Sequence, residues 1–453
     1  MKTQRRMILL IAILASFVAF LDGSVVSVAL PQISEQLGGG LLVQQWVNDA
    51  YLITLGTLIL AAGSLSDIFG RKKIITIGLV GFLVTSLLCA IAPTAGVLII
   101  SRGLQGIAGA LLVPSSLALI ISAFSGKQQA KAIGQWTAWT GIAFIIGPLV
   151  GGLLVDLLSW RWVFVINIIP ITIAMILLMR LDFEEEIKIR KRVDGLGIML
   201  GAIGLGGIVY SLIEQGHYGW NSPIIWGSFA VGVISMITFI IHERQTKEPM
   251  LPLELFNVRN FRIGNFATLL IYAALSLQGF LMVIFLQQVA GYPATIAGLV
   301  SLPITFIMFF LSSRFGALSS KYGPRLFMAI GPIIAGLGTL SMLNVQLPTN
   351  YWTQLLPGIV LFGLGLSITV APLTSAILGS IQPSRAGIGS AINNAVARIA
   401  GLLSVAVVGI FIGTTVTLDG FHIGLLLCST LLIIGGIISV VGIQNPATAD
   451  KTL

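Results

Sequence analysis

Charged residues are scarce in this chain of 453 residues. Asp, Glu, Lys and Arg together make up 9% of it, against about 25% in soluble domains, whereas hydrophobic residues make up 56%. The two cysteines, Cys89 and Cys428, lie in apolar stretches, which excludes a disulfide framework, a zinc ribbon and an iron–sulfur cluster. The net charge of +9 therefore belongs to the loops of a membrane protein, and nucleic-acid binding is excluded.

Long hydrophobic runs dominate the sequence. Each is close to the 20 or so apolar residues that one bilayer crossing needs. Their continuous apolarity and their Gly and Pro content favour helices over the alternating strands of a barrel. The sequence therefore predicts an all-α integral membrane protein with fourteen spans: Met7 to Leu30, Trp46 to Ser66, Lys73 to Ala92, Val97 to Ile121, Ala130 to Val155, Trp162 to Met179, Leu196 to Ile213, Pro223 to Ile241, Gly264 to Gln288, Thr295 to Ser313, Leu326 to Leu343, Leu355 to Leu378, Gly387 to Gly413 and Phe421 to Val441.

The distribution of Lys and Arg predicts the orientation of these spans. With the amino terminus placed in the cytoplasm, 22 of the 25 Lys and Arg residues fall in cytoplasmic segments and Arg161 alone falls outside. The remaining two, Arg102 and Arg398, lie within spans. We therefore expect a multi-pass protein of the inner (cytoplasmic) membrane with both termini in the cytoplasm.

An internal repeat divides the chain. The segment from Gly63 to Lys72 reappears in part 253 residues later, from Gly316 to Arg325, with Gly, Leu, Ser, Gly and a basic end in one register. Such a pairing of halves is typical of transporters built from repeated helix bundles. It predicts six-helix bundles at residues 1–182 and 262–453, joined by a linker with two inserted transmembrane helices at 183–261.

Four motifs resemble those of a known family over essentially the whole chain. They are Leu21 to Pro31 in the first span, Gly63 to Lys73 after the second, Arg102-Gly-Leu-Gln105-Gly106 in the fourth, and Gly141-x5-Gly147-Pro148-x2-Gly151-Gly152 in the fifth. Together they resemble the major facilitator superfamily, specifically its fourteen-span drug:proton antiporter branch. The resemblance implies the major facilitator fold and a secondary active transporter, with a proton gradient as the energy source and no cofactor.

The same resemblance implies a function. It is the proton-coupled efflux of lipophilic, mainly cationic, drugs by alternating access. The chain is also large enough to work as a monomer in the bilayer. An exporter of an endogenous lipid, siderophore or antibiotic would need the same coupling apparatus and stays open as an alternative. A membrane enzyme is disfavoured because His217, His242 and His422 are scattered and no nucleophile–base set is present.

Asp22 and Arg102 are the candidate proton-coupling residues. A carboxylate in a span costs about 2.5 to 3.5 kcal/mol on insertion scales, so a functional role is the default hypothesis for Asp22. At 1.5 Å per helical residue, Asp22 and Arg102 lie at similar depths in their spans, which predicts that they meet. A structural hydrogen bond or a static ion pair are the alternatives.

Two motifs are candidate gating elements. In the fifth span, Gly147 and Gly151 share one helix face and Pro148 bends the helix, which predicts a tight seam together with Gly141 and Gly152. The resemblance assigns this motif to antiport. It also implies a cytoplasmic latch made by Gly63, Asp67, Gly70, Arg71 and Lys72, although Ile68 stands where a basic residue often follows the aspartate.

Substrate contacts are expected from aromatic and polar side chains within the spans, because ligand cavities combine apolar walls with few polar groups. Asp49 and Glu214, near the outer ends of their spans, are either further acidic contacts for cationic substrates or solvated side chains, and their location at the interface favours solvation. Asp22 would then be the only deep acid, which predicts better transport of monocations than of dications. The candidate cavity residues are Trp46, Tyr51, Trp136, Trp139, Tyr272, Gln278, Phe280, Phe285, Gln287, Asn393, Asn394 and Arg398.

Overall fold

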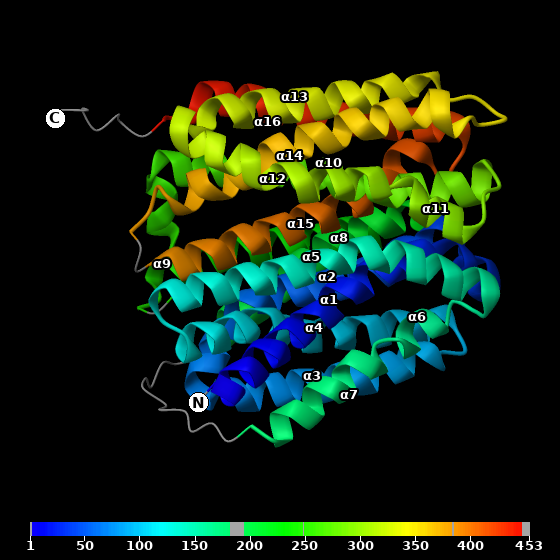
Figure 1. Ribbon diagram of the computed structural model, residues 1–453. Coiled ribbons are helices and arrows are strands. Elements are labelled where there is room, and N and C mark those ends of the chain that lie inside the picture. The colour runs from blue at the N-terminus through cyan, green and yellow to red at the C-terminus, as the bar shows by residue number, and fades with distance from the viewer. Residues whose placement is uncertain (1, 182–193, 248, 383–384, 446–453) are drawn as a thin grey trace. The chain divides into compact units, whose positions relative to one another are not determined.

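The computed structural model describes residues 2–181, 194–247, 249–382 and 385–445, and these form helices joined by short turns (Figure 1). Short π-helical segments at Phe285–Val289 and Tyr351–Leu355, and 3₁₀ turns at Leu253–Asn257 and Met342–Asn344, adjoin the longer helices. The α-helices are α1 (Lys2–Leu37), α2 (Gly40–Phe69), α3 (Arg71–Ala90), α4 (Ala95–Ala123), α5 (Gly126–Leu157), α6 (Trp162–Val165), α7 (Ile168–Met179), α8 (Gly195–Tyr218), α9 (Pro223–Gln245), α10 (Arg259–Ile284), α11 (Ala294–Val300), α12 (Leu302–Tyr322), α13 (Pro324–Ser341), α14 (Leu356–Leu378), α15 (Ala386–Ile412) and α16 (Leu418–Gly442).

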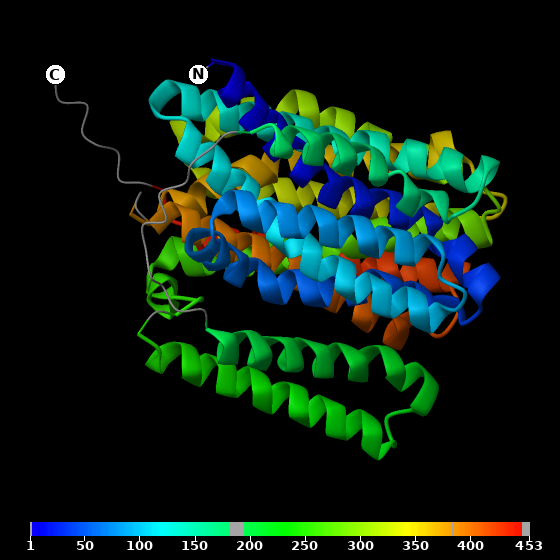
Figure 2. The ribbon, with the colours of Figure 1, turned by 90° about the horizontal axis from the view of Figure 1, so that it is seen from below.

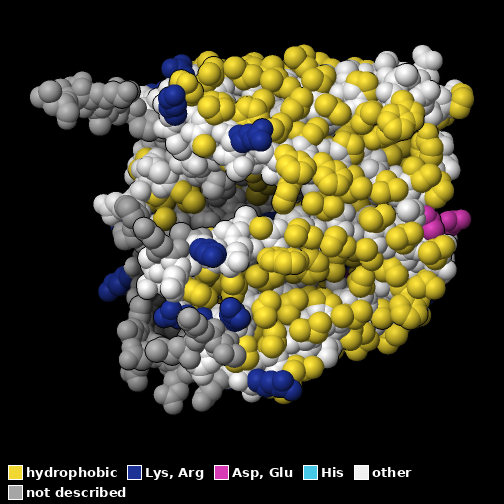
Figure 3. All heavy atoms as spheres, viewed as in Figure 1, with side chains coloured by type: hydrophobic (Ala, Val, Ile, Leu, Met, Phe, Trp, Pro, Cys, Tyr) yellow, Lys and Arg dark blue, Asp and Glu magenta, His cyan; other side chains and the backbone are white. Residues whose placement is uncertain are grey.

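Fourteen of the described segments are long and apolar enough to cross a membrane, which confirms the predicted number of spans. Some spans combine two consecutive helices, such as α6 with α7 and α11 with α12. Hydrophobic side chains cover most of the helix flanks visible in Figure 3, and the Lys and Arg side chains seen there lie toward one end of the helices. This is the surface that a bilayer requires, because charge is costly in its hydrocarbon core.

The chain divides into two compact units. Unit 1 comprises Met1–Leu251, Met282–Leu299 and Val405–Val416, and unit 2 comprises Pro252–Leu281, Val300–Ser404 and Thr417–Leu453. The bundle boundaries expected from the sequence, 1–182 and 262–453, remain a prediction.

The core of unit 1 is built from α1 to α5. In it, α1 packs against α4, α5 and α7, and α4 also packs against α2 and α3. Glycine allows the closest approach: a β-carbon at Gly106 of α4 would lie 2.3 Å from the Tyr51 carbonyl oxygen of α2. In lipid, the hydrophobic effect does not drive helices together. Small residues at helix crossings allow the close van der Waals packing that stabilises their association instead.

The inserted helices α8 and α9 form a closely packed antiparallel pair (Figure 2). A β-carbon at Gly207 would lie 3.0 Å from the α-carbon of Gly232, and one at Gly232 would lie 2.6 Å from the Ile208 nitrogen. Within unit 1, α8 also packs against α2. The contact between α8 and α2 thus attaches the pair to the rest of unit 1.

In unit 2, α13 packs against α14 and α16, and α12 packs against α14. Glycine again sets the spacing, since a β-carbon at Gly365 of α14 would lie 2.4 Å from the Gly331 carbonyl oxygen of α13.

Candidate functional site

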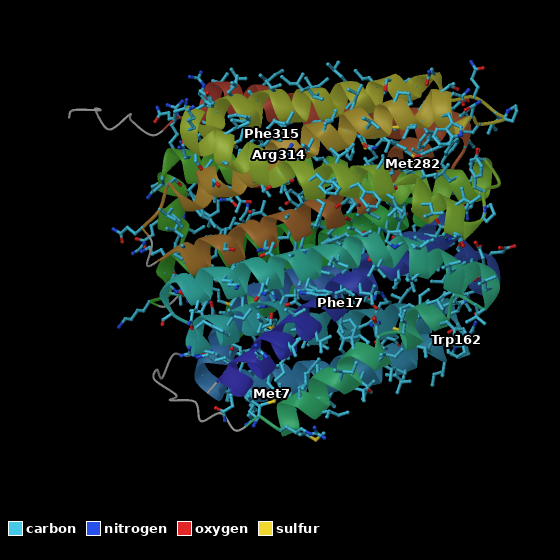
Figure 4. The ribbon with its side chains drawn as sticks, viewed as in Figure 1. Met7, Phe17, Trp162, Met282, Arg314 and Phe315 are labelled. Atoms are coloured by element: carbon cyan, nitrogen blue, oxygen red, sulfur yellow. The ribbon has the colours of Figure 1, made fainter. Side chains whose placement is uncertain are left out.

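A buried ion pair lies in the middle of unit 1. Asp22 is in α1, one and a half turns beyond Phe17, which is labelled in Figure 4. Its side chain is 0% exposed, and its Oδ2 lies 2.5 Å from Nη1 of Arg102 in α4. Each charge is therefore balanced by the other at a depth where neither could be left alone without a cost of several kcal/mol.

Two amide side chains complete the surroundings of the carboxylate. Gln105 donates from Nε2 to Asp22 Oδ1 over 3.0 Å, and Asn167 donates from Nδ2 to the same oxygen over 2.9 Å. Ser86 of α3 accepts from Gln105 over 2.9 Å. The amide donors therefore satisfy the carboxylate oxygen that Arg102 does not contact, and hydrogen bonds of this kind contribute about 1.5 to 3 kcal/mol each when the acceptor is charged.

Asn167 owes its position to an interruption of the sixth span. The α-helical hydrogen-bond pattern is interrupted between α6, which ends at Val165, and α7, which begins at Ile168, although Ile166 and Asn167 keep right-handed helical backbone angles. Asn167 occupies this interruption, fully buried, and its amide reaches across to α1. In the sequence, the only indication of this role was that Asn167 is a short polar residue within an apolar run.

Arg102 is held from several directions. Its Nε donates to the Val47 carbonyl oxygen over 3.1 Å, and its Nη1 also donates to Gln105 Oε1 over 2.7 Å. Its guanidinium carbon lies 4.3 Å from the centre of the Tyr51 ring and 5.9 Å from that of Phe164. A guanidinium on an aromatic face gains further stabilisation in a desolvated site.

The predicted contact between Asp22 and Arg102 is thus present, whereas their role in proton coupling stays a prediction. Sequence reasoning missed Asn167 and Ser86 as members of the network. Gln105 lay within the fourth-span motif, three residues from Arg102, and that spacing places the two on one helix face.

Asp49 corrects an expectation. It is 0% exposed in α2 and not solvated, it accepts one hydrogen bond from Asn48 over 2.8 Å, and its Oδ2 has no partner. Asp22 is therefore not the only deep acid, and the basis for a preference for monocations over dications is wrong. The error arose because sequence position gives the depth of a residue and not the direction it faces.

The fifth-span motif forms a tight seam between α1 and α5. A β-carbon at Gly147 would lie 1.8 Å from Ser24 Oγ, and one at Gly151 would lie 3.0 Å from the Val25 α-carbon. Gly141 has no atom within 4 Å of a β-carbon position, so packing does not require glycine there. The seam lies two to three residues beyond Asp22 on the same helix.

The fifth-span motif also packs closely against α11. A β-carbon at Gly152 would lie 2.4 Å from the Thr295 α-carbon, and one at Gly298 would lie 2.3 Å from the Pro148 carbonyl oxygen. Asp156 accepts hydrogen bonds from the Ala294 and Thr295 amides over 3.0 and 2.8 Å. These contacts cap the first turn of α11 and hold it against α5.

The predicted latch is described in part. Gly70 separates α2 from α3 with a φ of 90°, a conformation that glycine adopts without strain. Arg71 begins α3, and Lys72 donates to the Leu181 carbonyl oxygen over 2.5 Å. Gly63 has open space around it, and the side chain of Asp67 lies outside the described part of the structure.

The predicted cavity residues divide between the units, so their common cavity stays a prediction. In unit 1, Trp46 donates to Glu214 of α8 over 2.8 Å, and Trp136 donates to Ser16 over 3.0 Å. Gln287 donates to the Val28 carbonyl oxygen over 2.9 Å. The others in this unit are Tyr51, which stacks on Arg102, Trp139, which is exposed, and Phe285, which is buried.

In unit 2, Asn393 donates to Thr268 Oγ1 over 2.8 Å, and buried Gln278 accepts from Thr339 over 3.1 Å. The remaining members are Phe280, which is buried, Tyr272 and Arg398, which are half-buried, and Asn394, which is exposed.

Comparison with known families decides the class of the protein. The model of the Major Facilitator Superfamily matches residues 12–405. The chain belongs to this superfamily. Relatives include the multidrug transporter protein MdtP of Bacillus subtilis (32% identity, 90% of this chain and 75% of the relative) and the puromycin resistance protein pur8 of Streptomyces alboniger (32% identity, 88% and 80%). The methylenomycin A resistance protein of Bacillus subtilis is also 32% identical over 90% of this chain and 88% of its own.

Solved structures support the major facilitator fold. A crystal structure of the peptide transporter POT in complex with sulfate is similar with a TM-score of 0.70 and 15% sequence identity, covering 95% of this chain and 93% of that one. At this identity the likeness concerns the fold alone. Superfamily membership and the fourteen spans make this chain a transporter and a multi-pass protein of the inner membrane.

Proposed function

We propose that this transporter exports lipophilic, mainly cationic, drugs by alternating access, in exchange for protons that Asp22 carries. The observation that supports this most directly is the buried Asp22–Arg102 pair with its two amide donors. A titratable group inside a span, held by groups on several helices, is the arrangement that proton-coupled transport needs.

The coupling follows from differential stability. With Asp22 ionised, the network from α1 to α4 and Asn167 is satisfied and holds these elements together. Protonation removes the counter-charge of Arg102, and leaving a buried charge unpaired costs about 3 to 5 kcal/mol. The protonated protein therefore favours an arrangement in which Arg102 finds other partners, which is how a proton biases a conformational equilibrium.

The seam between α1 and α5 would pass this change on. Ser24, which packs on Gly147, lies two residues from Asp22 and donates to the Ala143 carbonyl oxygen over 3.1 Å. A shift of α1 near Asp22 must therefore move α5 or open the seam. This gives the fifth-span motif a physical part in the antiport cycle.

Drug efflux is supported by the relatives, whose names record resistance to puromycin and to methylenomycin A and multidrug transport. The test uses purified protein in vesicles with an acidic lumen and a pH indicator inside. We expect ethidium or tetraphenylphosphonium added outside to release luminal protons, because an antiporter exchanges one for the other. The proposal would be contradicted if neither cation released more protons than it does from protein-free vesicles.

A further inference from the structure

The inserted helix pair carries an acidic residue that the coupling network does not use. Glu214 lies in α8, four residues before the helix ends at Tyr218 and therefore about 6 Å along its axis. This is within a membrane span, at the end predicted to be external. Its carboxylate accepts a hydrogen bond from the indole nitrogen of Trp46 in α2 over 2.8 Å.

Two aromatic rings stand beside this carboxylate. Tyr210 precedes Glu214 by four residues and so lies on the same face of α8. Its ring centroid lies 6.0 Å from that of Trp46, with the two planes at 55°. All three side chains are half-buried, so the cluster is reachable from the surroundings of the helices.

The cluster lacks a balancing positive charge. Within the described residues, the ion pairs involve Asp22, Asp194 and Glu254, and none includes Glu214. Asp49, three residues beyond Trp46 on α2, is likewise without a basic partner in this part of the chain. Among the described residues, one carboxylate and two aromatic rings thus lie together, and no ion pair joins that carboxylate to a Lys or Arg.

We propose that Trp46, Tyr210 and Glu214 form a binding site for a lipophilic organic monocation, between α2 and the inserted helix pair. The carboxylate supplies the counter-charge and the ring faces attract the cation, which is worth more in a desolvated site than in water. Because the site lies near the predicted external end of the span, an exported cation would bind there just before its release from the protein. The inference rests on the proposed function only for that last role.

The competing explanation is that Glu214 merely ties α8 to α2 through the Trp46 indole. Glu214→Gln separates the two, because glutamine keeps an acceptor oxygen for the indole and removes the charge. Trp46→Phe is the matched variant, since it removes the hydrogen-bond donor and keeps an aromatic face. If the charge of Glu214 binds the cation, the first substitution should weaken cation binding more than the second does.

The experiment measures occupancy at the residue itself. Purified protein in detergent is treated with a lipophilic carbodiimide, which modifies carboxyl groups in apolar surroundings, and modification of Glu214 is quantified by peptide mass spectrometry. We expect saturating tetraphenylphosphonium to lower modification of Glu214 about tenfold, equivalent to 1.4 kcal/mol. Neutral triphenylphosphine oxide should not protect it, and modification of Glu243 at the other end of the pair should not change.

Absence of protection by the cation, or equal protection by the neutral compound, would overturn the site. Transport provides a second test: cation-driven proton release should fall about tenfold in Glu214→Gln and by less in Trp46→Phe. Unchanged release in Glu214→Gln would also overturn the proposal. Because carbodiimide protection needs no pH gradient, protection without any proton release would contradict the proposed antiport and leave the site intact.

Discussion

At the residue scale, the donors around Asp22 make the sharpest prediction. Asn167→Leu and Gln105→Leu each remove one hydrogen bond to the carboxylate, and we expect each to lower cation-driven proton release about tenfold, because such bonds contribute about 1.5 to 3 kcal/mol. Ser86→Ala removes a neighbour that does not contact Asp22 and should have a smaller effect. Wild-type rates in Asn167→Leu would show that the network takes no part in coupling.

Part of the site around Asp22 could be predicted from the sequence, and part of it could not. The pairing of Asp22 with Arg102 was predictable because both are costly in a span and their depths agree. The burial of Asp49 and the hydrogen bond from Asn167 to Asp22 were not predictable. The rotation of a helix about its axis decides both, and packing against neighbouring helices sets that rotation. Glu214, expected to be solvated, is half-buried against Trp46 for the same reason.

At the scale of the element, the seam between α1 and α5 is testable by adding one methyl group. Gly147→Ala would place a β-carbon 1.8 Å from Ser24 Oγ, so the two helices must separate. We expect destabilisation by about 1 to 3 kcal/mol, as overpacked interiors show, and a lower thermal unfolding temperature in detergent. Gly141→Ala, on the same helix with open space around it, is the matched control and should leave that temperature unchanged. Equal effects of the two substitutions would contradict the seam.

The start of α8 gives a pH-dependent prediction. Asp194 caps this helix by accepting from the Gly197 amide over 2.9 Å and contacts His242 of α9 over 2.8 Å. Burial raises the pKa of Asp194, but the Gly197 amide and His242 outweigh it, and the net pKa lies below its ordinary value. Its stabilisation is therefore present above the unfolded pKa of about 3.9 and is lost as the pH falls through the lower folded value.

Asp194→Ala should accordingly lower the free energy of unfolding by about 1 kcal/mol at neutral pH, the usual effect of losing a helix cap. The difference from wild type should shrink as the pH falls below about 4. Asp194→Asn keeps a capping oxygen and should lose only the contribution of the charge. A difference that is the same at pH 3 and pH 7 would exclude the charged cap. Thermal unfolding in detergent across this pH range measures it.

At the scale of the whole molecule, the orientation predicted from Lys and Arg can be read from the two ends of α9. Asn221→Cys, just before α9, should react with a membrane-impermeant maleimide added to intact cells, whereas Gln245→Cys, at its other end, should react only after permeabilisation. Both positions are exposed, and the native Cys89 and Cys428 are fully buried and should stay silent. The reverse labelling pattern would place both termini outside.

The number of spans was predictable because hydrophobic length alone decides it, and the structure agrees at fourteen. The helix ends were not, since helices continue past the apolar core: α1 covers Lys2–Leu37 where the apolar window was Met7 to Leu30. The interruption at Ile166 and Asn167 and the π-helical segment at Phe285–Val289 were also not predicted from the sequence. Such interruptions depend on contacts between helices, which a single sequence does not contain.

The central claim is that a proton on Asp22 drives export, and Asp22→Asn tests it most directly. The variant keeps a side chain of the same size that cannot titrate. In vesicles with an imposed pH gradient, we predict that a lipophilic cation that releases protons through the wild type releases none through the variant, while exchange of labelled for unlabelled cation without a gradient persists. Proton release of wild-type size in a folded Asp22→Asn protein would contradict the account and move the coupling group to another carboxylate.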